Sequence, residues 1–162
     1  MKKITVISLF VLLALVGTIG MASASMSKTV FRALIGGGAT GSDAQGNAVF
    51  VYSDDGSQMM YKLVVNGLEN TTQAHIHVAS TPGGNGPVVL WLYVDQPPFV
   101  ATLIPGVFNG LLGSRSVTSA DLTGAAGILS LEDLRIAIEE GRAYVNVHTT
   151  LFPGGEIRGD IH

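Results

Sequence analysis

Four histidines, His75, His77, His148 and His162, are the residues of this sequence whose type and spacing best suit chemistry. His75 and His77 stand two positions apart in an alternating run, and on a strand this spacing lets two imidazoles close around one ion. The sequence contains no cysteine, which excludes thiolate catalysis, zinc ribbons and iron–sulfur clusters. The chemistry that these residues indicate is metal binding through ring nitrogens.

The strands that carry the histidines are expected to place them on one side of a sheet, because side chains alternate between the two faces of a strand. In residues 73–78 the even positions are apolar and should face the core, which leaves His75 and His77 on the outer face. In residues 143–148 the odd positions are apolar, so His148 should also project outward. If the two strands are neighbours, the three imidazoles converge.

Such a convergence gives three nitrogen ligands and one coordination position open to solvent. Nitrogen ligation without thiolate suits Cu(II), Zn(II) or Ni(II), and Cu(II) stands highest in the affinity order. We therefore predict a surface metal site for copper formed by His75, His77 and His148, with zinc as the alternative ion. Asn146 shares the outer face and is expected to orient a ligand. His162 ends the chain, where fraying is normal, and is left outside the site.

An export signal is predicted over residues 1–24. Two lysines open the chain, a long apolar run follows, and Ala22-Ser23-Ala24 fits the small-x-small pattern that a signal peptidase accepts. An uncleaved membrane anchor is the alternative, because the run approaches the length that spans a bilayer. Cleavage would leave residues 25–162 as a single secreted or extracytoplasmic domain, periplasmic or at the cell surface, without a membrane attachment.

The charge of the chain excludes two classes of partner. The formal net charge is −3, and removal of a leader that contains two lysines makes it more negative. Nucleic acid requires a basic face for its phosphates, and anionic lipid requires a basic cluster. We therefore expect neither nucleic-acid binding nor electrostatic attachment to a membrane.

The rest of the sequence is typical of short strands separated by turn residues, with one short helix. Ser130 and Asp133 form a capping-box-like start for a helix near residues 131–140, and Gly141 ends it. Residues 95–129 are expected to form a long crossover with one more short strand. We predict an all-β, antiparallel Greek-key sandwich or barrel of seven to eight strands. The strands expected are 29–35, 48–52, 60–65, 73–78, 88–94, 143–148 and 156–161.

Two further groups of side chains receive structural interpretations. Glu156, Arg158 and Asp160 alternate along the last expected strand and are predicted to form a solvated ladder of ion pairs. Trp91 and Tyr93 share one face of an apolar strand and are expected in the core or at an interface.

Three segments of this sequence resemble the CHRD domain, the module named after chordin. They are Ala74-His75-Ile76-His77, Gly86-Pro87-Val88-Val89, and the segment that runs from Ala143-Tyr144-Val145-Asn146-Val147-His148-Thr149 through Phe152-Pro153-Gly154-Gly155-Glu156-Ile157-Arg158-Gly159. The resemblance covers about residues 29–161 and implies an exported all-β module. In chordin-like animal proteins the module lies within a protein that binds growth factors, a property that we do not carry over to a stand-alone module. An extracellular or cell-surface protein partner is the general expectation.

The strand pair that bears the histidines is also similar, more loosely, to the copper half of Cu/Zn superoxide dismutases. That resemblance implies His75, His77 and His148 as copper ligands. The sequence departs from those enzymes because no histidine between His77 and His148 could bridge a second metal, and no cysteine pair is present. A copper-only site stays open.

Three functions follow from these observations. The predicted function is copper handling, storage or sensing without turnover. A copper-only dismutase-like redox enzyme is the second, and it would need a cationic guide for its anion, for which Arg142 and Arg158 are the candidates. The third is a non-catalytic extracellular protein-binding module in which the histidines are incidental.

Overall fold

The structure is a computed structural model that describes residues 28–93 and 100–162. The predicted export signal lies outside the described residues. Within them, no helix has the length and apolar character needed to cross a membrane. The elements are β1 (Val30–Gly37), β2 (Ser42–Tyr52), β3 (Met59–Val78), β4 (Val88–Tyr93), β5 (Ile104–Val117), two short 3-10 turns (Ser119–Asp121 and Ala125–Gly127), α1 (Leu131–Glu139), β6 (Ala143–Thr149) and β7 (Ile157–Asp160).

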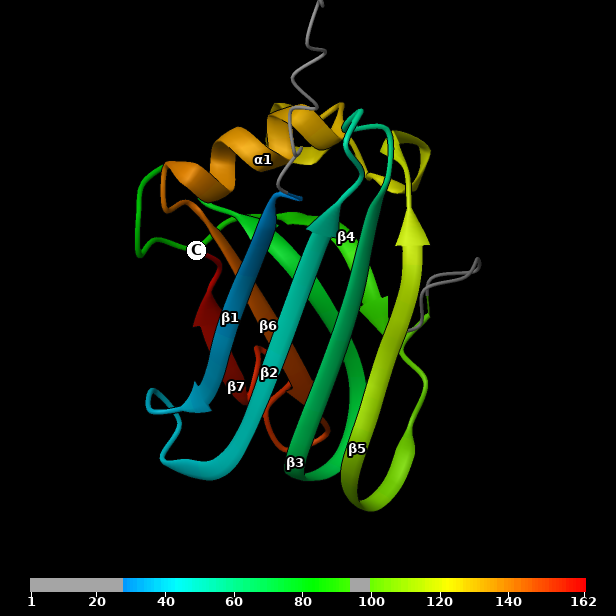
Figure 1. The fold of residues 1–162 in the computed structure, drawn as a ribbon. Coiled ribbons are helices and arrows are strands. Elements are labelled where there is room, and N and C mark those ends of the chain that lie inside the picture. Colours follow the sequence, from blue (N-terminus) through cyan, green and yellow to red (C-terminus); the bar gives the residue numbers. More distant parts are fainter. Residues whose placement is uncertain (1–27, 94–99) are drawn as a thin grey trace, which may run out of the picture.

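The seven strands form one antiparallel sheet that closes into a barrel. The strands follow the order β2-β1-β7-β6-β3-β4, and β2 also pairs with β3, which closes the ring. Strand β5 pairs with the first half of β3 on the edge opposite to β2. In Figure 1, β1, β2, β5 and the first half of β3 form the near wall, β6 and β7 lie behind them, and α1 crosses one end. The predicted all-β class is confirmed.

The interior of the barrel is filled by the apolar face of each strand. In β1 the buried side chains Phe31, Ala33 and Ile35 alternate with exposed ones, as the half-buried pattern requires. Helix α1 turns four apolar side chains onto the end of this core, and its first turn is capped because Ser130 Oγ accepts from Asp133 N at 3.1 Å. Burial of each large aliphatic side chain contributes about 1.5–3 kcal/mol.

Strand β3 is continuous over 20 residues, so the prediction of two separate strands at 60–65 and 73–78 was wrong. Its first half pairs with β2 and β5, and its second half with β4 and β6. Between Val65 and Leu68 the register shifts by one extra residue on β3, where Gly67 has a φ of 77° and donates its N–H to Asn109. The result is a β-bulge inside one strand.

The segment 95–129 also differs from expectation, because it contains the 14-residue strand β5 rather than a crossover with one short strand. Most side chains of β5 are exposed or half-buried, with Leu112 and Val117 alone fully buried in the described strand. Without regular apolar alternation the sequence carries no clear strand signal. For the same reason the expected strand 48–52 is too short, because β2 begins at Ser42 and includes the polar residues 42–46.

Closure of the barrel between β1 and β7 depends on a glycine at position 159. A Cβ atom there would overlap the carbonyl of Leu34, whereas a Cβ atom at Gly36 on the same seam would meet nothing. We therefore expect Gly159→Ala to lower the free energy of unfolding by about 2 kcal/mol or more through overpacking. Gly36→Ala should change it by less than about 1 kcal/mol. Equilibrium denaturation of both variants measures the difference. Equal free energies of unfolding would contradict the requirement for glycine at position 159 in the β1–β7 contact.

Candidate metal centre

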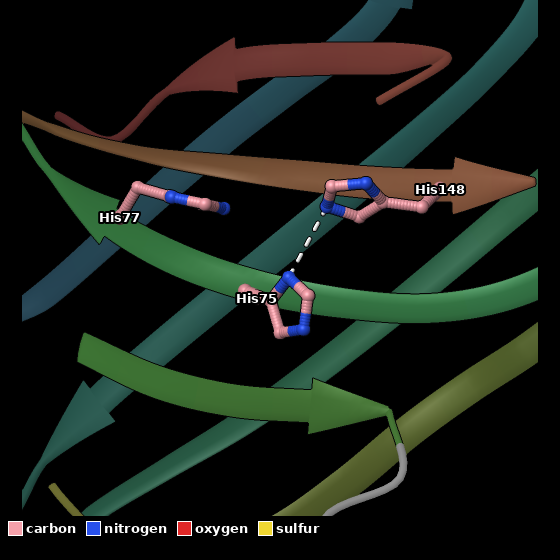
Figure 2. Close-up of side chains that lie close together, drawn as sticks. All are labelled: His75, His77 and His148. Carbon is pink, nitrogen blue, oxygen red and sulfur yellow. Dashed lines mark hydrogen bonds between the residues drawn. The ribbon is translucent and has the colours of Figure 1, made fainter. Parts of the chain in front are cut away.

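His75, His77 and His148 are brought together on the outer wall of the barrel. Each offers one ring nitrogen to a group in which all three ligand atoms lie within 4.8 Å of one another. His75 and His77 come from β3 and His148 from β6, and these strands are neighbours, as the convergence required. Figure 2 shows the three rings turned toward a common space between the two strands.

The outward direction of His75 and His77 follows from irregularities in the middle of β3. In the first half of the strand the odd positions fill the core. The buried side chains then fall three residues apart instead of two, at Val65, Leu68, Thr71 and Ala74. Each such step exchanges the two faces of the strand, and three exchanges have the net effect of one. Even positions such as Ile76 therefore fill the core beside β6, and the histidines at odd positions face away from it.

The three histidines are nevertheless covered, and the prediction of a solvent-exposed surface site was wrong. His75 is 3% exposed, His148 is 6% exposed, and His77 is half-buried. Two loops, residues 79–87 and 150–156, supply backbone contacts to this face of the sheet. The site lies under these loops rather than on an open sheet.

The first loop holds His77 in one tautomer. His77 Nδ1 lies 2.9 Å from the carbonyl oxygen of Gly86, and since a carbonyl only accepts, Nδ1 carries the proton. The lone pair is therefore on Nε2. The ring of Tyr144 stacks on His77 with 5.0 Å between centroids and 6° between planes. The Tyr144 hydroxyl also accepts from the N–H of Gly86 at 3.2 Å, which ties the loop to β6.

The second loop holds His148 in the same way. His148 Nδ1 lies 2.9 Å from the carbonyl oxygen of Pro153 and donates to it, which again leaves the lone pair on Nε2. Asn146 Nδ2 donates to the carbonyl of Gly154 at 3.1 Å and anchors this loop to β6. Gly155 has a φ of 113°, and a Cβ atom there would overlap the Asn146 side chain. Asn146 therefore contacts the loop that holds His148 rather than a histidine ring.

His75 completes the group from the middle of the site. Its Nδ1 lies 3.1 Å from His148 Nε2, the contact drawn in Figure 2. The ring of Trp91, from β4, stands perpendicular to His75 with 4.2 Å between centroids. The Nε2 atoms of His75 and His77 are buried and have no hydrogen-bond partner among the described residues. Two buried nitrogens are thus left without a bond.

Burial favours the neutral form of all three imidazoles. It lowers the pKa of each, because the charged form loses its hydration. The pKa of His75 falls to about 3, and repulsion from His148 and then His77 adds to the effect of burial. For His77 burial is again the largest cause of the lower pKa; the Gly86 carbonyl opposes it, whereas positive charge on His148 and Arg158 adds to it. Neutral imidazole is the form that binds a metal.

The arrangement can therefore hold a metal ion. An ion placed 2.0–2.1 Å from imidazole nitrogens separates two such ligand atoms by about 3–3.5 Å. The 3.1 Å between His75 Nδ1 and His148 Nε2 already matches this separation. His77 directs its unprotonated Nε2 toward the same space. The ligand atoms would be Nε2 of His77 and His148 and Nδ1 of His75. In the metal-free protein His75 Nδ1 donates to His148 Nε2, so metal binding would move that proton to the unpartnered Nε2 of His75.

Two arginines of the outer face hold the first loop. Arg158 donates to the carbonyl of Gly84 and to Asn85 Oδ1, both at 2.7 Å, and its guanidinium lies 3.5 Å over the Tyr144 ring. Arg142 donates to the carbonyl of Ala79 and pairs with an exposed glutamate. Both candidates for guiding an anion are therefore engaged in contacts of the loop.

The last strand differs from the predicted ladder of solvated ion pairs. Glu156 is buried, and its carboxylate accepts from Ser42 and Thr149, both at 2.6 Å. Arg158 and Asp160 form the exposed part of the ladder, 3.8 Å apart. The alternation was predicted correctly, but the burial of Glu156 against Ser42 and Thr149 was missed.

His162 lies outside the group of three histidines, as predicted, but its surroundings differ from a frayed end. Its backbone exchanges two hydrogen bonds with Arg32 of β1, at 2.8 and 3.0 Å. The chain end therefore continues the pairing of β7 along β1. The His162 side chain is exposed and takes no part in the metal-binding group.

The carbonyl contacts lead to a prediction about proton positions. In the metal-free protein at neutral pH, we expect His77 and His148 to carry the proton on Nδ1, the opposite of the tautomer that free histidine prefers in water. Two-bond ¹H–¹⁵N correlation spectra of imidazole-labelled protein distinguish the two forms. Nε2–H tautomers at both residues would contradict the assigned ligand atoms.

The chain matches the CHRD domain over residues 31–161, which is most of its length. No curated protein matches it, and neither does any solved structure, so the looser resemblance to Cu/Zn superoxide dismutases gains no support from these comparisons. The domain match covers all three histidines and both loops that hold them. The chain therefore belongs to the CHRD domain family.

Proposed function

We propose that this protein is an exported CHRD-domain protein that binds one copper ion through His75, His77 and His148. The observation that carries the proposal is the convergence of three neutral imidazoles within 4.8 Å, two of them fixed by backbone carbonyls in the tautomer that offers Nε2. A chance group of surface histidines has no reason to be buried with its ring nitrogens this close together.

Copper is the preferred ion because the donor set consists of imidazole nitrogen. Such a set suits copper, zinc and nickel, and copper binds most strongly among the divalent ions. Among the described residues, the metal-binding group includes no carboxylate, the ligand that would favour calcium, magnesium or manganese. Zinc is the alternative ion.

The role proposed for the ion is handling, storage or sensing rather than turnover. Fast redox catalysis on a small anion needs an open coordination position and a free cation near it. The His77 Nε2 atom is buried, and Arg158 and Arg142 are occupied by the loop over the site. These features favour a carrier over a dismutase.

Export is proposed from the N-terminal segment and from the family. Residues 1–24 have the charge pattern, apolar run and cleavage motif of a signal peptide. Copper would then be met outside the cytoplasm, and a protein partner on the cell surface stays a prediction of the family resemblance.

The first test is metal binding by the protein purified without a histidine tag. One copper ion per chain should bind with micromolar or tighter affinity, and His75→Ala and His148→Ala should each weaken it by about 100-fold or more. His162→Ala is the matched control and should leave binding unchanged. Trp91 is the only tryptophan and lies against His75, so quenching of its fluorescence by Cu(II) reports occupancy directly.

Equal copper affinity in the wild type, in His75→Ala and in His148→Ala would contradict the proposal. Copper bound without quenching of Trp91 would also count against it, because the ion would then lie elsewhere.

A second test addresses the loop that holds His148. Asn146→Ala removes the donor to the Gly154 carbonyl and should weaken copper binding by about 10- to 100-fold, the usual effect of losing a group that orients a ligand. The barrel should keep its far-ultraviolet circular dichroism. Asn47→Ala, an exposed position of β2, serves as the control and should bind copper normally. Unchanged affinity in Asn146→Ala would show that the loop does not position the ligand.

A further inference from the structure

We propose that the ion this site is built to hold is Cu(I), in preference to Cu(II) or Zn(II). The inference rests on the proposed function and deepens it, because it names the oxidation state of the bound copper. It follows from three features of the same site: the number of donors, their charge, and the charge of what surrounds them.

The number of donors favours an ion of low coordination number. The group contains three ligand residues among the described part of the chain, each offering one nitrogen. Cu(II) favours square-planar or tetragonal sites, and zinc takes four ligands, the fourth often water. A closed-shell Cu(I) ion is satisfied by three. The buried His77 Nε2 indicates that solvent does not freely supply the missing ligand.

The charge of the donors favours a monovalent ion. All three ligands are neutral imidazoles, and neither a thiolate nor a carboxylate of the described residues joins them. The charge of a divalent ion would therefore stay uncompensated in a site where His75 is 3% exposed. Since the energy of burying an ion rises with the square of its charge, the desolvation energy of a divalent ion is about four times that of a monovalent one.

The surroundings act in the same direction. The charged side chain that influences His77 most directly, apart from the histidines, is the cation Arg158. Arg158 is fixed over the Tyr144 ring, and Tyr144 in turn stacks on His77. The indole of Trp91 covers His75 from the side of β4. A fixed cation raises the energy of a divalent ion more than that of a monovalent one.

Imidazole itself binds copper in both oxidation states, so the preference must appear as a ratio of affinities. Anaerobic competition with bicinchoninate measures the Cu(I) affinity of the full protein, and competition with nitrilotriacetate measures the Cu(II) affinity. We expect Cu(I) to bind about 100-fold more tightly or better. That ratio would raise the reduction potential of bound copper by about 120 mV above that of the aqueous couple, at 59 mV for each factor of ten.

A charge variant separates the electrostatic argument from a general preference for copper. Gln73 precedes His75 on the same face of β3 and lies directly opposite His148. Gln73→Glu keeps the shape and adds one negative charge, so it should shift the affinity ratio at least tenfold toward Cu(II). Gln45→Glu, on an exposed position of β2, adds the same charge at a distance and should leave the ratio unchanged.

The outcomes distinguish this inference from the proposed function. If neither ion binds, the proposed function and the preference for Cu(I) are both overturned. If Cu(II) binds as tightly as Cu(I) or more so, and His75→Ala abolishes that binding, the proposed function stands and the preference for Cu(I) is overturned. That preference is overturned as well if Gln73→Glu leaves the ratio at the wild-type value.

Discussion

Strand β3 exchanges its two faces between Val65 and Ala74, and the position of the metal centre follows from that exchange. The strand belongs to both walls of the barrel, because its first half pairs with β2 and its second half with β6. With regular alternation from Val65 onward, the odd positions His75 and His77 would enter the core as unpaired polar groups. The register shifts in between, the first of them at Gly67, prevent this and align both histidines with β6.

Strand β6 contacts both of the loops that hold His77 and His148 in place. Its outward side chains are Tyr144, Asn146 and His148, at successive positions of one face. The first anchors the loop that fixes His77, the second anchors the loop that fixes His148, and the third is itself a proposed ligand. A single run of alternating residues therefore contacts both of the loops whose carbonyls fix the tautomers of His77 and His148. This also explains why the strand is buried on both faces.

The part of the site that could be predicted from the sequence is the part encoded in side-chain alternation. The alternation of side chains along each strand predicted that the three histidines lie on outer faces, and it placed Asn146 on the same face as His148. Burial could not be predicted, because the covering groups include the backbone carbonyls of Gly86 and Pro153, and a carbonyl leaves no trace in residue type. The continuity of β3 was missed because Asn66-Gly67 has the composition of a turn, although here it forms a bulge.

The unpaired ring nitrogen of His77 lowers the stability of the metal-free site. A buried polar atom without a partner lowers stability by about 1–3 kcal/mol, and His77 Nε2 is such an atom among the described residues. An apolar side chain at this position would remove that penalty but would also remove the donor to the Gly86 carbonyl. The Gly86 carbonyl fixes the proton on Nδ1, so only a donor or a metal ion can satisfy Nε2. Metal binding and the stability of this wall of the barrel are therefore linked, since an ion that binds the folded site alone stabilises the fold.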